Sequence, residues 1–149
     1  MKRSVRQSGF TLVEVLIVVV IMAILAATII PQFSDSTRDA KVSTTTFNLH
    51  TLRSQIELYK TQHNGVVPSG TLVELTVNTD ADGNQGTGST FPYGPYIREI
   101  PDNPFTNSNA ITVIANDPAV AGDVTGNTGW LFNTTTGGIW IDHADYFDE

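Results

Sequence analysis

GFTLVEVLI (residues 9–17) opens an apolar segment that continues to residue 30 and ends against Pro31. Between residues 10 and 30 the only polar side chains are those of Thr11, Glu14 and Thr28. A helix of about 20 predominantly apolar residues spans a bilayer core, so this segment is long enough to cross a membrane. Glu14 is the residue that needs an explanation, because a carboxylate inside hydrocarbon is costly unless it finds a partner.

The residues before this segment are short, polar and basic. Short basic flanks stay on the cytoplasmic side, so the chain after residue 30 is expected on the far side of the membrane. An ordinary secretory signal would also begin this way, with cleavage near Ala26 or Ala27, but Leu25 makes a poor match to a small-x-small site. A plain single-span anchor accounts for the length and orientation and leaves Glu14 unexplained.

Residues 9–14, with the basic leader before them and the apolar run after them, resemble the type III signal of the type IV pilin superfamily. In that family a membrane-embedded prepilin peptidase cuts after the glycine, here Gly9, and methylates the new N-terminal residue, here Phe10. The resemblance implies that residues 1–9 are a leader. It also implies that Glu14 pairs with the N-terminal amine of a neighbouring subunit during filament assembly.

The physical chemistry of these residues agrees with that role. The amine of a processed Phe10 would be a cation at the end of an apolar helix, with Glu14 one turn away on the same face. Pairing between chains would favour one axial register, because an unpaired buried charge costs several kcal/mol. The alternative is that Glu14 lies near the headgroups and complements the positive N-terminus of its own helix, an effect of about 0.3–1 kcal/mol.

After Pro31 the apolar pattern becomes one-sided, which predicts an amphipathic helix over residues 31–63. Pro31 removes a backbone hydrogen bond and can kink the path, yet the helical pattern resumes at once and stops at Asn64-Gly65. We expect the apolar stripe to pack on a small sheet, since its spacing does not hold a strict heptad. The stripe consists of Phe33, Ala40, Phe47, Leu52, Ile56 and Tyr59.

Residues 64–149 predict a small β-rich domain with loops. Strand patterns occur at residues 111–115, 129–133 and 138–141, and we expect them to form a three-stranded antiparallel meander. Residues 71–77 fit a short helix or a strand equally well, and the proline-rich segment 91–105 is expected to be extended and anchored to the helix by its aromatic rings. The predicted fold is therefore α+β and pilin-like, with a long N-terminal helix packed on a small antiparallel sheet.

Two acidic regions are candidate cation sites. Asn78, Asp80 and Asp82 stand at the first, third and fifth places of a calcium-loop spacing, followed by Gly83 at the sixth, but the twelfth place is a serine. A solvated polar loop is the other interpretation of this segment. The second region is expected to be a solvated acidic tail. It consists of Asp142, His143, Asp145, Asp148 and Glu149.

Composition excludes several functions. The chain carries a formal charge of −7, and three of its eight basic residues precede the apolar segment, so the remainder is strongly acidic and a nucleic-acid partner is not expected. With no cysteine there is no disulfide and no Cys-based zinc site. No nucleophile–base motif accompanies His50, His63 or His143, so we do not expect an enzyme.

Within the superfamily, the lack of cysteine and the compact C-terminal region resemble the major pseudopilin of type II secretion; a type IV pilin of a surface fibre is the alternative. The resemblance implies a homo-oligomeric helical filament, a prepilin peptidase, an inner-membrane assembly platform with its ATPase, minor pseudopilins, and a bilayer that holds the subunit before assembly. It also implies a single-pass inner-membrane protein with a periplasmic domain. Major pseudopilins usually carry a calcium loop between late strands, but residues 133–138 hold no carboxylate here, so calcium dependence is in doubt.

Overall fold

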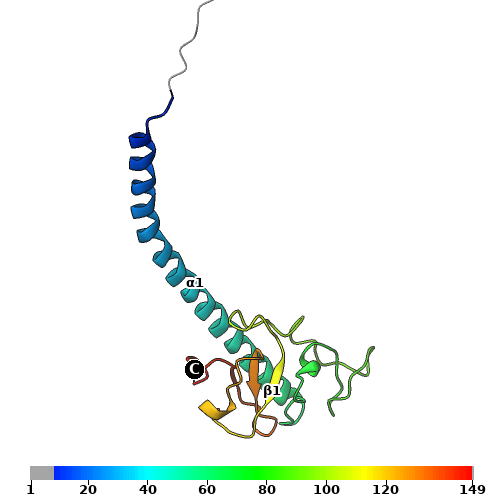
Figure 1. Cartoon of the computed structure of the whole chain (residues 1–149). Coiled ribbons are helices and arrows are strands. Elements are labelled where there is room, and N and C mark those ends of the chain that lie inside the picture. Colours follow the sequence, from blue (N-terminus) through cyan, green and yellow to red (C-terminus); the bar gives the residue numbers. More distant parts are fainter. Residues whose placement is uncertain (1–8, 149) are drawn as a thin grey trace, which may run out of the picture. The chain divides into compact units, whose positions relative to one another are not determined.

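The computed structural model describes residues 9–148, except for the side chains at positions 31 and 34 (Figure 1). The leader expected at residues 1–9 therefore lies outside the described residues up to position 8, and so does Glu149 of the expected acidic tail. Two compact units make up the chain, one ending at Ala40 and the other beginning at Lys41. The elements in order are α1 (Leu12–Gln62), η1 (Val73–Leu75), β1 (Ile111–Val113), η2 (Ala121–Asp123), β2 (Trp130–Phe132) and β3 (Ile139–Ile141).

The first unit contains the apolar part of α1. Its side chains from residue 12 to residue 30 are exposed within the chain, including Val15, Ile21 and Leu25. Within residues 9–148, α1 is the one helix whose length and apolar composition are sufficient to cross a membrane. α1 continues through position 31 without interruption, as the helical pattern on both sides of Pro31 predicts.

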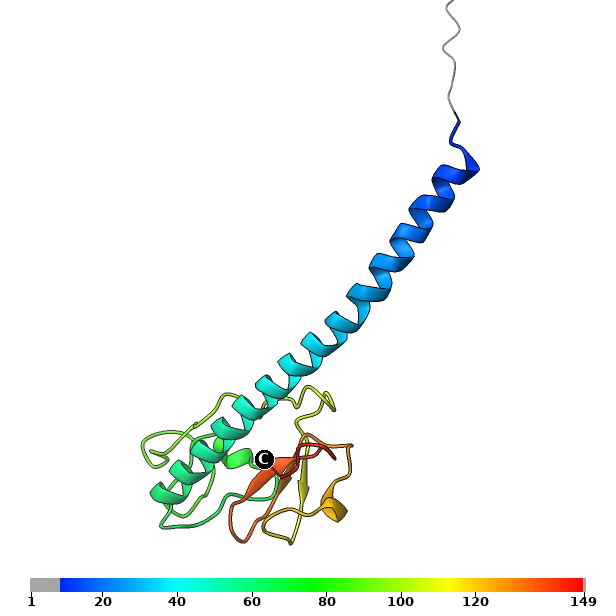
Figure 2. The same cartoon turned by 90° about the vertical axis from the view of Figure 1, so that its left-hand side faces the viewer.

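The second unit is built on the last third of α1. Leu49, Leu52, Ile56 and Tyr59 recur at helical spacing and are almost fully buried, so one face of this helix segment forms one side of the core. The expected stripe is confirmed at Leu52, Ile56 and Tyr59. It is wrong at Phe33, Ala40 and Phe47, which are exposed, since the buried face of the helix runs through Leu49 instead. The core residues from the rest of the unit are Leu72, Leu75, Trp130, Phe132, Ile139 and Ile141. Figures 1 and 2 both show this part of α1 running beside the sheet.

The sheet has the order β1-β2-β3 and contains both kinds of strand pairing. β2 and β3 are antiparallel, with Leu131 opposite Trp140, as the sequence predicts. β1 and β2 are parallel, so the expected antiparallel meander is wrong at this pair. The physical reason is the connection at residues 114–129, which is long enough for the crossover that a parallel pair requires.

Alternation along β2 and β3 covers both faces of the sheet. Trp130 and Phe132 point to the helix side, and Leu131 points to the opposite side, where it packs with Trp140 and Ile114. The α+β class, with a long helix packed against a small sheet, is confirmed, and the sheet is mixed rather than antiparallel.

The end of α1 follows the predicted stop signal. Asn64 adopts a left-handed conformation with φ 53°, and the N–H of Gly65 donates to the carbonyl of Lys60 at 2.7 Å. His63, the residue before Asn64, is fully buried and stacks on Tyr59 with ring centroids 3.8 Å apart. Its Nε2 lies 3.0 Å from Oγ1 of Thr79, which ties the start of the 78–93 loop to the helix.

The segment after this loop is anchored by aromatic and apolar groups, as expected. Residues 73–75 form the 3-10 helix η1. The N–H groups of Tyr96 and Ile97 both donate to the carbonyl of Leu75, the last residue of η1, so the segment after the loop is hydrogen-bonded to this helix. The hydroxyl of Tyr96 donates to Gln62 near the end of α1 at 2.7 Å. This segment is therefore held to the helix through one ring and one short turn.

Candidate assembly site at the start of the helix

Thr11 is the N-cap residue of α1, and its side chain forms a reciprocal pair with Glu14. The N–H of Glu14 donates to Oγ1 of Thr11 at 3.2 Å, and the N–H of Thr11 donates to Oε2 of Glu14 at 2.8 Å. These two bonds form a capping box, which satisfies two N–H groups that the first turn of a helix leaves without partners. The hydroxyl of Thr11 also donates to the same Oε2 at 2.9 Å.

This arrangement fixes where the carboxylate of Glu14 points. All the bonds from Thr11 end on Oε2, which leaves Oε1 without a hydrogen bond from any of the residues 9–148. A carboxylate has about four lone-pair sites, so Glu14 keeps acceptor capacity for a further donor. The capping box therefore leaves the carboxylate of Glu14, which is expected to act in assembly, able to accept another hydrogen bond.

Phe10 lies immediately before the helix and is 89% exposed. It shares a surface groove of about 300 Å³ with Glu14, and the rest of the groove is apolar: Val15, Val18 and Val19. The structure thus brings Phe10 and Glu14 together on one surface. The amine that is expected to pair with Glu14 does not exist in the uncleaved chain, because the nitrogen of Phe10 is in a peptide bond with Gly9.

Gly9 has no structural need to be a glycine in this chain. A Cβ added at Gly9 would meet no atom of residues 9–148 within 4 Å, and the backbone of Gly9 does not adopt the left-handed region. The described part of the chain therefore gives no packing or backbone reason for a glycine at position 9.

The calcium candidates lie together in the 78–93 loop, but Asp80 is turned toward N–H groups. Its Oδ1 accepts from the backbone N–H groups of Asp82 and Asn84, and its Oδ2 accepts from the Asn84 side chain, each at 2.9 Å. The Asn84 amide holds the pKa of Asp80 below its ordinary value. The side-chain amide of Asn78 donates instead to the carbonyl of Phe91. As folded, the carboxylate of Asp80 and the side-chain amide of Asn78 are engaged in the hydrogen bonds of a turn.

The side chain of Asn133, in the turn between β2 and β3, is also engaged in hydrogen bonds of the turn. Oδ1 of Asn133 accepts from the N–H groups of Thr135 and Thr136, and no carboxylate stands in residues 133–138. Among the described residues, no group of three or more His, Cys, Asp or Glu side chains is placed to hold a metal ion.

One part of the acidic-tail expectation is wrong. Asp142 is fully buried directly after β3 and accepts hydrogen bonds from the 125–128 segment, so it belongs to the domain interior. The physical reason is that neutral N–H and O–H donors surround the carboxylate and replace the water molecules that hydrate an exposed charge. Farther along the chain, the ring of Tyr146 stacks on Phe105, and the ring of His143 lies tilted against it.

Sequence reasoning missed Thr11 and Asp142. The Thr-x-x-Glu spacing of residues 11–14 is a capping-box signal and was sufficient to find Thr11. Asp142 had no comparable signal, since its donors lie in a distant loop.

The chain is similar to characterised proteins along most of its length. Residues 5–30 match the family described as a prokaryotic N-terminal methylation motif. The type II secretion system core protein G of Klebsiella pneumoniae is 30% identical over 100 residues, covering 67% of this chain and 70% of that protein. The same-named protein of Vibrio cholerae is 30% identical over 110 residues, covering 72% and 71%, and that of Aeromonas hydrophila is 28% identical over 102 residues, covering 68% and 70%. No solved structure gives a significant match.

A methylation motif that opens a long apolar helix, followed by a small α+β domain built on the same helix, defines a pilin-like protein. The similarity covers about two thirds of the chain and so extends well beyond the motif at residues 5–30. The chain belongs to the family of type II secretion system core protein G, the major pseudopilin.

Proposed function

We propose that this chain is a structural subunit of a type II secretion pseudopilus, a periplasmic filament that drives protein export across the outer membrane. The observation that carries the proposal is the similarity to core protein G over about two thirds of the chain, together with the methylation motif at residues 5–30. The family is a structural one, and we assign no catalytic step to the chain.

Processing comes first in the proposed mechanism. A prepilin peptidase cuts after Gly9 and methylates the amine of Phe10, and the exposed position of both residues ahead of α1 supports access by such an enzyme. The processed subunit is held in the inner membrane by residues 10–30, with its N-terminus cytoplasmic and residues 41–149 in the periplasm.

Assembly then depends on Glu14. In the membrane the carboxylate is costly, and the capping box with Thr11 offsets only part of that cost. Oε1 is available for the Phe10 amine of an adjacent subunit, and this pairing selects one axial register because a shifted register leaves two unpaired charges in apolar surroundings. The energy for extraction comes from a partner ATPase at the assembly platform, since the chain has no phosphate-binding loop.

Complementation of a host that lacks this gene tests the proposal. Glu14→Gln keeps the size of the side chain and removes its charge, so we expect normal amounts in the membrane and a loss of secretion of at least about tenfold, because each 1.4 kcal/mol is tenfold and an unpaired buried charge costs more. Thr28→Ala is the matched control, since Thr28 lies in the same apolar segment and its hydroxyl bonds only to the carbonyl of Ile24.

The outcomes separate the candidate functions. Loss of exoprotein secretion in the gene deletion, restored by the native chain and not by Glu14→Gln, supports the pseudopilus. Intact secretion with loss of surface fibres would instead establish the alternative, a type IV pilin of a surface fibre. Normal secretion by Glu14→Gln would contradict the pairing mechanism.

A further inference from the structure

The connection between β1 and β2 has little regular structure to hold it. β1 and β2 have three residues each, and the crossover at residues 114–129 contains only the three-residue η2. Parallel strands are usually joined through a helix that packs on the sheet. Something other than secondary structure must therefore fix this connection.

Its first half is held by Asp123. Both carboxylate oxygens of Asp123 accept from the side-chain amide of Asn116, at 2.9 and 3.0 Å, and Oδ2 also accepts from the N–H of Val120. These bonds lie at the surface and close residues 116–123 into a local loop. They do not reach the sheet.

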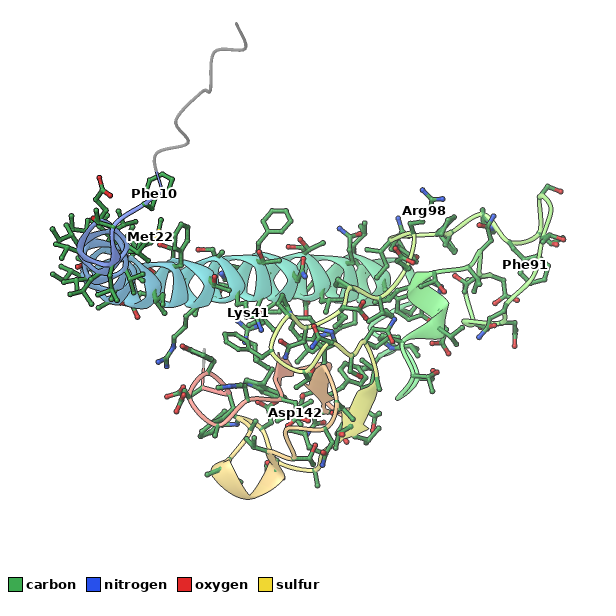
Figure 3. All side chains as sticks on the ribbon, turned by 45° about the horizontal axis from the view of Figure 1, so that its top comes forward. Phe10, Met22, Lys41, Phe91, Arg98 and Asp142 are labelled. Atoms are coloured by element: carbon green, nitrogen blue, oxygen red, sulfur yellow. The ribbon has the colours of Figure 1, made fainter. Side chains whose placement is uncertain are left out.

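The second half is held by Asp142, which follows β3 and is labelled in Figure 3. Oδ1 of Asp142 accepts from the backbone N–H groups of Thr125 and Gly126, at 2.7 and 2.9 Å. Oδ2 accepts from the Thr125 hydroxyl and from both the N–H and the hydroxyl of Thr128, at 2.5, 2.9 and 2.7 Å. Five donors from three residues of the four-residue stretch 125–128 thus converge on one carboxylate.

The backbone of residues 125–128 is shaped for this. Gly126 has φ +65°, and a Cβ there would meet nothing within 4 Å, so the conformation and not the space favours glycine. A left-handed residue next to ordinary ones turns successive N–H groups toward a common point and forms a nest, which binds anions. The hydroxyl of Thr128 is oriented by a 2.8 Å contact with Thr112 of β1, so the nest is also connected to the sheet.

The chemistry of the nest excludes a cation as its occupant. Every group that faces the Asp142 oxygens is an N–H or O–H donor, and all of them are neutral. A metal ion would have to displace these hydrogens to reach the oxygens. A buried carboxylate with several donors is stabilised by charge-assisted hydrogen bonds, without any ion pair.

We propose that residues 125–128 form a carboxylate-binding site that Asp142 fills from within the chain, and that filling this site fixes the crossover between β1 and β2. The site recognises a planar carboxylate through three backbone N–H groups and two hydroxyls. An external carboxylate of small size therefore fits once the side chain of Asp142 is removed.

Chemical rescue of the full chain in detergent tests this directly. Asp142→Ala leaves five donors without an acceptor, so we expect the melting temperature, followed by the fluorescence of Trp130 and Trp140, to fall by about 10 °C. Sodium formate replaces the missing group. With a Kd of about 50 mM, formate at about 200 mM raises the melting temperature of Asp142→Ala by about 4 °C relative to sodium chloride of the same ionic strength.

The controls distinguish site occupancy from general salt effects. Ile141→Val is a matched control, because it lowers the stability of the domain by removing one methylene next to Asp142 and leaves the carboxylate in place. Formate should raise the melting temperature of this variant no more than that of the native chain. Equal shifts in Asp142→Ala and Ile141→Val overturn the proposal. So do an unchanged melting temperature in Asp142→Ala, or its restoration by calcium chloride and not by formate.

A second pair of variants applies if Asp142→Ala does not fold. Thr125→Val removes one hydroxyl donor and Thr125→Ser keeps it, so hydrogen exchange of the amides at residues 125–128 should accelerate at least about fivefold in the first and remain near the native rate in the second. Equal exchange rates in the two variants would also overturn the proposal.

Discussion

Thr11 and Glu14 bind each other in both directions at the first turn of α1, the hydroxyl of Thr11 accepting from the N–H of Glu14 and the carboxylate of Glu14 accepting from the N–H of Thr11. The proposed assembly group is therefore also a helix cap. One side chain caps the helix within a subunit, and in the proposed mechanism its second oxygen pairs with the amine of a neighbour. Substitution of Thr11 removes the cap and leaves the carboxylate of Glu14 in the chain, so it tests whether the cap positions Glu14 for assembly.

Thr11→Val tests the positioning of Glu14. Valine keeps the shape of threonine and removes the hydroxyl, which costs about 1 kcal/mol of cap stability and frees the carboxylate to rotate. We expect amide exchange at residues 12–14 to accelerate about fivefold and filament yield to fall, while Thr11→Ser behaves like the native chain. Filament yield that is the same for valine and serine would show that the cap does not position Glu14.

Phe47 tests which face of α1 meets other subunits. It is 70% exposed, on the face of the helix opposite the buried Leu49 and Leu52. Phe47→Glu should leave the melting temperature within about 2 °C of the native value, because exposed substitutions usually change stability by less than about 0.5 kcal/mol. If this face packs in the filament, the same variant reduces the yield of filaments and Phe47→Leu does not; equal yields for the two variants would place Phe47 outside the contact.

The pH dependence of stability tests the ionised state of Asp142. Burial raises the pKa of this carboxyl, but the hydrogen bonds from Thr125, Gly126 and Thr128 lower it by more, so its folded pKa lies below the ordinary value of 3.8. A lowered folded pKa contributes stability that is present above the unfolded pKa and is lost as the pH falls through the folded pKa. We therefore expect the difference in unfolding free energy between the native chain and Asp142→Asn to be constant above about pH 5 and to shrink as the pH falls from about 5 to values below 3.8. A difference that stays constant would mean that Asp142 is not ionised in the fold.

Calcium is the cofactor for which the sequence offers candidates. Because the oxygens of Asp80 accept three N–H bonds in the loop, we expect a melting temperature that changes by less than about 1 °C between EDTA and about 5 mM calcium chloride. Asp80→Ala combined with Asp82→Ala is the control. A calcium-dependent rise of several degrees that this double variant abolishes would establish a site at residues 78–82 and contradict the expectation.

The long helix and the β2–β3 hairpin were predictable because their signals are periodic and local. Apolar residues at helical spacing placed α1 to within two residues at each end, and Asn64-Gly65 marked its stop. The hairpin followed from two short apolar runs, Trp130–Phe132 and Ile139–Ile141, on the two sides of a turn. In each case residues that contact one another lie close together in the sequence.

The parallel pairing and the role of Asp142 depend on contacts between distant residues. Ile111–Val113 alternates equally well in either direction, and only the length of residues 114–129 pointed to a crossover. Asp142 stands in a charged stretch that is typical of a solvated tail, and its burial depends on donors from Thr125 and Thr128 that folding brings to it. A pattern within one segment does not contain this information.

The measurement that tests the account most directly is the intact mass and N-terminal residue of the protein recovered from the membrane fraction of its own host. The account predicts a chain that begins at N-methylated Phe10, because the free amine at that position is the partner of Glu14. An intact Met1, or a chain that begins near Ala27, would contradict it and restore the plain anchor or the secreted domain.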